Sequence, residues 1–265
     1  MKSILITGAY GGMGQAVANY LAEKGFRVFA LDQRTGESRK NVIPIQADIT
    51  SEESLRTALT ILQQHTDSLY AILHFAGIYM LDSLVEMDAA AFRRIIDVNL
   101  NGAFLINQVF FPLLHKGSRI LIVTSELAPL DPLPFTGVYG LSKSALDKYA
   151  YSLRMELQLL GIQVSVLRAG AVKTDMLGVS TDHLERFYKN TRLYTCNARR
   201  FRTIVNRVEA RCISPEKIAK KTAGILQKRH CAFVYNINRN PLLLLLNMLP
   251  KRIQLWAIRT VLKSE

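Results

Sequence analysis

Short apolar runs alternate with longer amphipathic segments along the first two thirds of the chain. The apolar runs have the length of β-strands and lie at Ser3–Thr7, Phe26–Leu31, Val42–Ile45, Leu69–Phe75, Arg119–Ser125 and Ile162–Leu167. The segments between them, such as Gln15–Lys24, repeat apolar residues at the spacing of one helix face. Strands that alternate with helices require a parallel sheet with right-handed crossovers. The pattern therefore predicts an α/β fold, a doubly wound parallel sheet in a three-layer αβα arrangement.

Other segments refine these elements. Val42–Ile45 contains a proline, which suits an edge strand, and the third strand of a doubly wound sheet is an edge. Cys231–Tyr235 predicts a further strand, which brings the sheet to about seven. A long helix is expected over Ala89–His115 with a kink at Asp97–Gly102, because asparagine and glycine are unfavourable inside a helix. Thr50–Glu53 has the pattern of a capping box that opens another helix.

The length of the chain and its few cysteines limit the number of domains and the kinds of cross-link to be expected. A chain of 265 residues can bury a large core without disulfides or metal, so we expect one domain, residues 1–265. The three cysteines show no ligand spacing, and no metal site is expected. This usage is typical of a reduced, cytoplasmic setting. The chain enters an apolar run directly after Met1-Lys2, so no cleavable signal is expected there.

Most of the net charge of +13 lies in one region of the chain. Between Arg186 and Arg229 there are 13 lysines and arginines against two acids. A local basic region indicates an anionic substrate, an acidic partner or a membrane surface, whereas a uniformly basic chain would indicate nucleic acid. We therefore expect no nucleic-acid partner. A solvated surface that only keeps the protein in solution is the alternative interpretation.

The tail, at about residues 236–265, is apolar and basic. Its leucine run, Pro241–Leu249, is far shorter than the ~20 residues that a membrane span requires. The end of the chain is an amphipathic pattern that contains Trp256, Arg259 and Lys263. Such a segment can lie on a membrane, cover a substrate pocket or pack on another subunit. We expect a protein that contacts membranes peripherally at most.

A glycine-rich loop joins the first predicted strand to the first helix. Its glycines are Gly8, Gly11, Gly12 and Gly14. Glycines let a pyrophosphate approach the backbone, and the helix N-terminus offers unpaired N–H groups to it. The next strand ends on Asp32, a suitable acceptor for a ribose diol, and this βαβ unit predicts dinucleotide binding. Asp32 favours NAD because it would repel the extra phosphate of NADP, while the nearby Arg34 keeps NADP as an alternative.

Candidate chemistry lies further along the chain. Tyr139 and Lys143 are four residues apart in a predicted helix, so they share one face. A cation beside a tyrosine favours the phenolate, and the pair could move a proton at an alcohol oxygen. Ser125 lies at the carboxyl end of a strand, where open α/β sheets gather their chemistry. Asp48 follows the third strand and is placed to accept a bond from an adenine amino group.

Together these motifs resemble the short-chain dehydrogenase/reductase family, from Ile4 to about Thr174. The matching residues are Thr7, Gly8, Gly12, Gly14, Asp48, Ala76, Gly77, Asn99, Ser125, Tyr139, Lys143, Gly170 and Thr174. The resemblance implies a Rossmann-type fold and an NAD(P)-dependent oxidoreductase. It also implies a cofactor-binding set of Gly8, Tyr10, Gly11, Gly12, Met13, Gly14, Asp32, Asp48, Ile49, Ala76, Gly77, Tyr139, Lys143, Gly170, Val172 and Thr174.

The same resemblance assigns the catalytic roles. Tyr139 would be the acid/base at the reacting oxygen, and Lys143 would hold the nicotinamide ribose and lower the pKa of the tyrosine. Ser125 would hydrogen-bond the reacting oxygen, Asn99 would complete a proton relay through water, and Thr174 would fix the nicotinamide carboxamide. The sequence departs from the family where His74-Phe75 replaces the usual pair of asparagines before Ala-Gly, and we expect a structural role for His74.

In this family the segment after Thr174 forms a substrate lid, here expected at about residues 175–213. The resemblance implies the interconversion of a secondary alcohol and a ketone, or of an alcohol and an aldehyde. Because this lid is long, aromatic and basic, with an apolar tail behind it, we expect a large hydrophobic substrate that carries a negative charge, such as a steroid, a retinoid or a long-chain lipid. One alternative is a reductase of acyl thioesters carried on coenzyme A or an acidic carrier protein. Another is a non-catalytic dinucleotide-binding regulator or scaffold. The family habit implies a homodimer or homotetramer.

Overall fold

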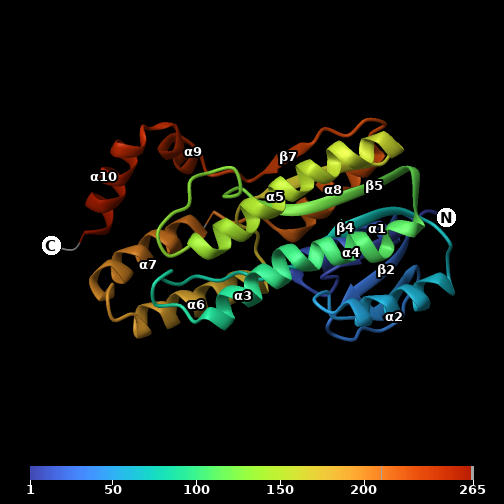
Figure 1. Cartoon of the computed structure of the whole chain (residues 1–265), viewed down its shortest axis with the longest axis horizontal. Helices are drawn as coiled ribbons and strands as arrows, with labels where there is room; N and C mark the ends of the chain where they lie inside the picture. Colours follow the sequence, from blue (N-terminus) through green and yellow to red (C-terminus); the bar gives the residue numbers. More distant parts are fainter. Residues whose placement is uncertain (210, 264–265) are drawn as a thin grey trace.

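A single parallel sheet lies at the centre of the computed structural model (Figure 1), in the strand order β3-β2-β1-β4-β5-β6-β7. The structure describes residues 1–209 and 211–263, and their side chains except those of 175–182 and 206–209. The strands are β1 (Ser3–Thr7), β2 (Arg27–Asp32), β3 (Val42–Gln46), β4 (Leu69–His74), β5 (Leu114–Ser125), β6 (Gln163–Ala169) and β7 (Val234–Ile237). The predicted doubly wound sheet is confirmed, with the proline-containing β3 at one edge.

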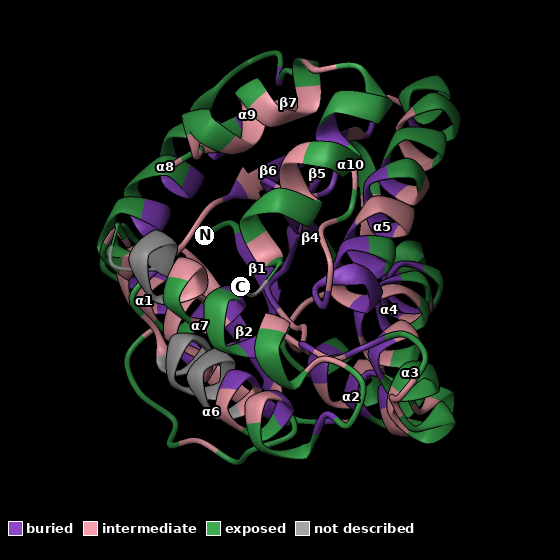
Figure 2. Ribbon diagram, turned by 90° about the vertical axis from the view of Figure 1, so that its left-hand side faces the viewer, coloured by how far each residue is buried: buried purple, intermediate pink, exposed green. Residues whose placement is uncertain are grey.

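Helices cover both faces of the sheet, as expected for three layers. The helices are α1 (Gly12–Glu23), α2 (Glu52–Gln63), α3 (Ala89–Ile96), α4 (Gly102–Phe110), α5 (Gly137–Leu157), α6 (Asp175–Asn190), α7 (Thr195–Glu209), α8 (Pro215–Gln227), α9 (Pro241–Met248) and α10 (Lys251–Leu262). Residues of α1 and α8 share one core with the strands, and residues of α2, α4 and α5 form the cores of the opposite face. The strands are buried between these layers (Figure 2).

The register brings the carboxyl ends of the central strands together. Thr7 pairs with His74 across β1 and β4, and Ser125 pairs with Ala169 across β5 and β6. The loops that follow these strands therefore open at the same edge of the sheet. This edge receives the glycine loop, the Ala76-Gly77 turn and the loop that leads into α5.

Two predicted elements differ from the structure. The expected helix Ala89–His115 is divided by a π-helix at Asp97–Asn101 and ends at Leu113, where β5 begins earlier than expected. The π-helix accounts for the predicted kink. The early end follows Pro112, which lacks an N–H group and lies in a 3-10 turn. The capping box was also misplaced, because Ser51 is the N-cap of α2 and accepts from the Ser54 backbone.

The two segments after β6 are helical. The expected lid forms α6 and α7, whose apolar residues pack against Leu81 and Phe135 in a separate cluster. The tail forms α9 and α10, at the opposite end of the molecule from the N-terminus (Figure 1). Hydrogen bonds join it to the lid and the body: Asn197 of α7 donates to the Leu262 carbonyl (2.7 Å), and Gln254 donates to Asp131 (3.1 Å).

Candidate active site

Tyr139 and Lys143 lie in the first two turns of α5, directly beside the end of β5. The Ser125 hydroxyl hydrogen-bonds the phenol of Tyr139. Tyr79 packs against the same ring, with 4.7 Å between the ring centroids. Lys143 is buried, its Nζ donates to the Val123 carbonyl (3.4 Å), and it lies 5.9 Å from the centre of the Tyr139 ring. The structure thus brings the predicted tyrosine, lysine and serine together.

The electrostatics of this group differ from the expectation. Burial raises the pKa of Tyr139 to about 12, with the bond from Ser125 opposing the rise and the Glu126 carboxylate adding to it. Burial also lowers the pKa of Lys143 to about 8. Lys143 was expected to lower the pKa of the tyrosine. In this structure desolvation of the phenol outweighs any such effect, and the Lys143 ammonium is directed to a backbone carbonyl.

Asn99 lies in the π-helix and is fully buried, but its side chain already has partners. Its Nδ2 donates to the Ile78 carbonyl and to Ser142 Oγ, both at 2.9 Å, and its Oδ1 accepts from the Ile78 backbone (2.8 Å). Both amide hydrogens are therefore used to hold the loop after Gly77 against α5. The role of Asn99 in a proton relay stays a prediction.

An ion pair beneath α5, the helix of Tyr139 and Lys143, fixes its position on the sheet. Asp147, one turn beyond Lys143, receives two bonds from Arg168 of β6, at 3.0 and 2.6 Å. Thr124 of β5 donates to the same carboxylate (3.2 Å). Because the carboxylate is largely buried and doubly bonded, it ties α5 to two central strands.

The glycine loop borders a cavity of about 300 Å³ at the edge of the sheet. Gly8 has a φ of +65°, and a Cβ there would lie 2.6 Å from the Ala76 nitrogen. A Cβ at Gly14 would lie 2.1 Å from the Gly8 carbonyl oxygen. The N-cap of α1, Gly11, makes no side-chain capping bond, so the helix N-terminus offers N–H groups to the cavity. These features fit a dinucleotide, with its pyrophosphate at the helix N-terminus.

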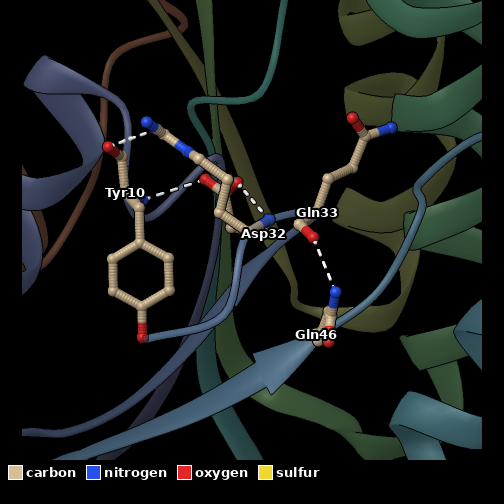
Figure 3. Close-up of polar contacts among 5 residues, drawn as sticks. Tyr10, Asp32, Gln33 and Gln46 are labelled. Atoms are coloured by element: carbon tan, nitrogen blue, oxygen red, sulfur yellow. Dashed lines mark hydrogen bonds and ion pairs between the residues drawn. The ribbon is translucent and has the colours of Figure 1, made fainter. Parts of the chain in front are cut away.

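Asp32 organises the far end of this cavity (Figure 3). Its carboxylate accepts from the Tyr10 backbone (2.9 Å) and the Arg34 backbone (3.1 Å), and Arg34 Nε lies 3.5 Å from it. Arg34 also donates to the Tyr10 carbonyl, and Gln46 donates to the Gln33 carbonyl (3.0 Å). The carboxylate therefore lines the cavity while it joins the glycine loop to the loop after β2.

The predicted cofactor residues fall into three groups. Those that line the dinucleotide cavity are Gly8, Gly11, Gly12, Met13, Gly14, Asp32, Ile49, Ala76, Gly77 and Thr174. Those that line a second cavity are Met13, Tyr139, Gly170, Val172 and Thr174. Tyr10, Asp48 and Lys143 line neither: the Tyr10 ring lies against Gly36, and Asp48 Oδ1 accepts two bonds from Thr50, at 2.8 and 2.7 Å. Lys143 lies beside Gly77, where a Cβ would be 3.1 Å from Nζ.

The second cavity has a volume of about 220 Å³ and adjoins the first at Met13, Tyr79 and Thr174. Ser125 and Tyr139 lie in its wall. Its apolar residues come from distant segments and include Leu127, Leu133, Phe201, Ile204, Val205 and Leu243. Glu126 is the one residue of the described lining that carries a formal charge. The predicted reacting groups thus face an apolar space next to the dinucleotide cavity.

Glu126 follows Ser125 directly and connects this cavity to the tail. Burial raises the pKa of its carboxyl group, and the Asn240 backbone, which donates to Oε2 at 2.6 Å, opposes the rise. Asn240 is the N-cap of α9. The carboxylate therefore holds the beginning of the helix that carries Leu243 into the cavity wall.

Sequence reasoning missed several residues of the two cavities. Tyr79 and Glu126 each lie within two residues of an assigned position, and their proximity to Gly77 and Ser125 was the available signal. Arg94 lines the dinucleotide cavity from α3. Phe201 and Leu243 come from the lid and the tail, whose general role was expected but whose inward-facing residues were not identified.

Comparisons with known proteins agree with this geometry. The short chain dehydrogenase family model matches residues 2–185. The chain is 30% identical over 248 residues to short-chain dehydrogenase PC-15 of Penicillium crustosum, covering 89% of this chain and 85% of that protein. It is 30% identical over 191 residues to estradiol 17-beta-dehydrogenase 2 of Mus musculus, covering 67% of this chain and 50% of that protein. The chain therefore corresponds to about half of the mouse protein's length.

A solved structure supports the same fold. The crystal structure of a short chain dehydrogenase family protein from Francisella tularensis superposes with a TM-score of 0.75, at 23% identity, over 89% of this chain and 97% of that chain. The relatives are named dehydrogenases and reductases, and the family uses NAD or NADP. The chain is thus an oxidoreductase that acts on CH–OH groups, and it belongs to the short-chain dehydrogenase/reductase family.

Proposed function

We propose that the protein interconverts a secondary alcohol and a ketone, or an alcohol and an aldehyde, on a large hydrophobic substrate. The observation that carries this proposal is the apolar cavity that adjoins the dinucleotide cavity at the Ser125–Tyr139 pair. Apolar cavities with a few convergent polar groups are typical of small-molecule sites. The mouse relative, by its name, acts on estradiol, a compound of this class.

The residues divide the chemistry between them. A bound nicotinamide cofactor would supply or accept the hydride. In reduction, the Tyr139 hydroxyl gives its proton to the carbonyl oxygen as it becomes an alkoxide, and in oxidation the phenolate takes that proton back. Ser125 donates a hydrogen bond to the same oxygen and orients it. Lys143, buried beside Gly77, places a cation next to the phenolate that forms during reduction.

We propose NAD as the preferred cofactor. Asp32 places a carboxylate in the cavity, where it suits a ribose diol and disfavours an added phosphate. NADP is the alternative, because Arg34 pairs with Asp32 and both Arg34 and Arg94 line the same cavity. With either cofactor, Asp48 and Tyr10 would contribute indirectly, by holding the loops that form the cavity wall.

The substrate is proposed to be neutral where it enters the cavity. No cation lines the described part of this wall, and its one carboxylate would repel an anion. Several described basic residues of the lid and tail, among them Arg192, Arg199 and Arg259, are instead exposed on the outside, where an anionic group of a longer substrate could reach them. An acyl thioester on an acidic carrier protein remains the second candidate because of that basic exterior, and a steep loss of rate with added salt would distinguish it.

The assembly and setting are also proposals. Short-chain dehydrogenases are commonly oligomers, and α4 and α5 expose several large apolar side chains. These are Phe104, Leu141, Tyr151 and Met155. We propose a homodimer or homotetramer built on this face, leaving the tail free. A cytoplasmic location is consistent with Cys196, Cys212 and Cys231, which are all free thiols.

Turnover of a substrate panel with NAD and NADP, in both directions, tests the proposed reaction. Hydrophobic alcohols and ketones should react, and small sugars and polyols should not. Tyr139→Phe should lower kcat by about a thousandfold while cofactor affinity changes little, because it removes only the proton-transferring oxygen. Tyr151→Phe is the matched control, since it removes a phenol oxygen from an exposed position of the same helix, outside both cavities. Equal turnover of sugars, or full activity of Tyr139→Phe, would contradict the proposal.

A further inference from the structure

The tail presents an apolar surface to solvent. The members of this surface, here called the tail face, are Leu242, Leu245 and Met248 of α9 with Leu255 and Trp256 of α10, each between 60% and 82% exposed. In Figure 2 much of α10 is coloured as exposed. Among residues 1–209 and 211–263, no helix combines the length and hydropathy needed to cross a bilayer. The tail face thus places five exposed large apolar side chains within residues 242–256, where such residues are usually scattered singly on a monomer.

This apolar surface is firmly attached to the body of the protein. On its inner side, Asn247 accepts from the Asp131 backbone (2.8 Å), while Lys251 pairs with the Asp131 carboxylate. Gln254 is buried and also donates to Asp131. Three polar residues of the tail are thus held to Asp131 on the inner side, while Leu242, Leu245 and Leu255 are left exposed on the outside.

The tail itself carries exposed cations, of which Lys251 is paired with Asp131. Residues 236–264 contain five lysines and arginines and no aspartate or glutamate. Within α10, Arg252, Trp256 and Arg259 follow one another at helical spacing, and Lys263 continues the row. Arginine and tryptophan on the exposed side of a helix are the residues that an interfacial helix places at lipid headgroups.

The charges of the tail distinguish two possible partners of the tail face, a second copy of the chain and an anionic lipid surface. A second copy of the chain would bring its own tail cations against these, and like charges at an interface are unfavourable. An anionic lipid surface satisfies both features at once, because the headgroups neutralise the cations and the acyl region accepts the leucines and the tryptophan. We propose that α9 and α10 dock the protein peripherally on an anionic membrane surface.

Docking would place the substrate cavity next to the bilayer. Leu243 lies on the inner side of α9 and forms part of the cavity wall, whereas Leu242 and Leu245 point outward on the same helix. Glu126 holds the beginning of α9 beside Ser125. Uptake of an apolar substrate from the membrane follows from this arrangement, and this part of the inference rests on the proposed function.

The single tryptophan of the chain is Trp256, so intrinsic fluorescence reports on the tail face alone. The full chain is titrated, without cofactor or substrate, with phosphatidylcholine vesicles that contain or lack phosphatidylserine. We expect a blue shift and co-sedimentation with the anionic vesicles, weakening as salt is added. Arg252→Gln with Arg259→Gln should weaken the vesicle affinity by about tenfold or more, and Leu245→Ser with Leu255→Ser should abolish the blue shift.

Matched controls separate the tail face from general basic or apolar effects. Lys40→Gln with Lys116→Gln removes two exposed cations elsewhere, and Leu159→Ser removes an exposed leucine in the 3-10 turn that follows α5. Both should bind vesicles like the parent protein. Turnover of a water-soluble ketone, measured on the same variants, should be unchanged. If the parent protein shows no turnover of ketones, the proposed reaction is contradicted, whereas the result on vesicle binding still stands.

Three results would overturn the docking proposal. One is the absence of a shift with anionic vesicles. Another is a shift that grows with protein concentration when no vesicles are present, because it would assign the tail face to a second copy of the chain. The third is an equal shift with polyglutamate, which would assign it to an acidic protein.

Discussion

The two adjoining cavities differ in the atoms that form their walls. The dinucleotide cavity is shaped by backbone and by missing side chains, because Gly8 and Gly14 allow contacts that a Cβ would occupy. The substrate cavity is shaped by apolar side chains from α7, α9 and the loop before α5. Where the backbone forms the wall, few other residue types are tolerated at a position. An apolar wall tolerates the exchange of one side chain for another of similar volume.

This difference separates what the two cavities determine. A shared backbone cradle suits one cofactor used by many enzymes, and a side-chain wall suits substrates that vary from one enzyme to the next. Met13, Tyr79 and Thr174 belong to both cavities, so the proposed reaction would take place where the two kinds of wall meet. Changes confined to either side should therefore affect cofactor and substrate separately.

The largest effect is expected from Gly14→Ala. The added Cβ would lie 2.1 Å from the Gly8 carbonyl oxygen, which is backbone and can move only if the loop moves. Cofactor affinity should fall on the order of a hundredfold, and the melting temperature should fall as well. Titration with NAD, together with thermal unfolding, measures both.

Gly224→Ala provides the control for Gly14→Ala. Gly224 lies inside α8, and no atom lies within 4 Å of the position that an added Cβ would take. Alanine there should stabilise the helix by about 0.5–1 kcal/mol and leave NAD affinity unchanged. If Gly14→Ala binds NAD as the parent does, the backbone account of this cavity is wrong.

The same contrast explains how much the sequence could predict. The strand–glycine loop–helix pattern is local, so the dinucleotide cavity could be predicted from Gly8 to Asp32 without the structure. The kink near Asn99 was also visible, because asparagine and glycine conflict with a helix. Phe201 and Leu243 could not be assigned, since apolar residues in a helix face whatever the tertiary packing provides. The raised pKa of Tyr139 could not be predicted either, because it depends on burial.

His74, near the dinucleotide cavity, should make the folded protein less stable at acid pH. It is buried at the end of β4, its Nε2 lies 2.9 Å from Asn107 Oδ1, and burial lowers its pKa to about 4. The unfolded chain takes up a proton below an ordinary value of 6.5, and the folded protein only below about 4. Stability should therefore be lost as pH falls from 6.5 to 4, by up to about 3 kcal/mol.

Unfolding in urea across that pH range measures the effect. His74→Asn removes the titrating group, so the acid decline should become shallower, whereas His230→Asn, at an exposed position, should keep the parent profile. An unchanged acid decline in His74→Asn would show that another group is responsible. The substitution changes only the end of β4 that leads into Ala76-Gly77. The apolar wall of the substrate cavity should therefore be unaffected.

The smallest expected effect concerns cofactor choice at Asp32. Replacing it by serine removes the carboxylate and releases Arg34 from its pair, so the ratio of kcat/KM for NADP to that for NAD should rise by about tenfold. Glu37→Ser, an exposed acid on the same loop, should leave this ratio unchanged. The KM for the hydrophobic substrate should stay constant in both variants, because Asp32 lines only the dinucleotide cavity. A change in substrate KM without a change in the cofactor ratio would mean that the two cavities are coupled through the glycine loop and do not act separately.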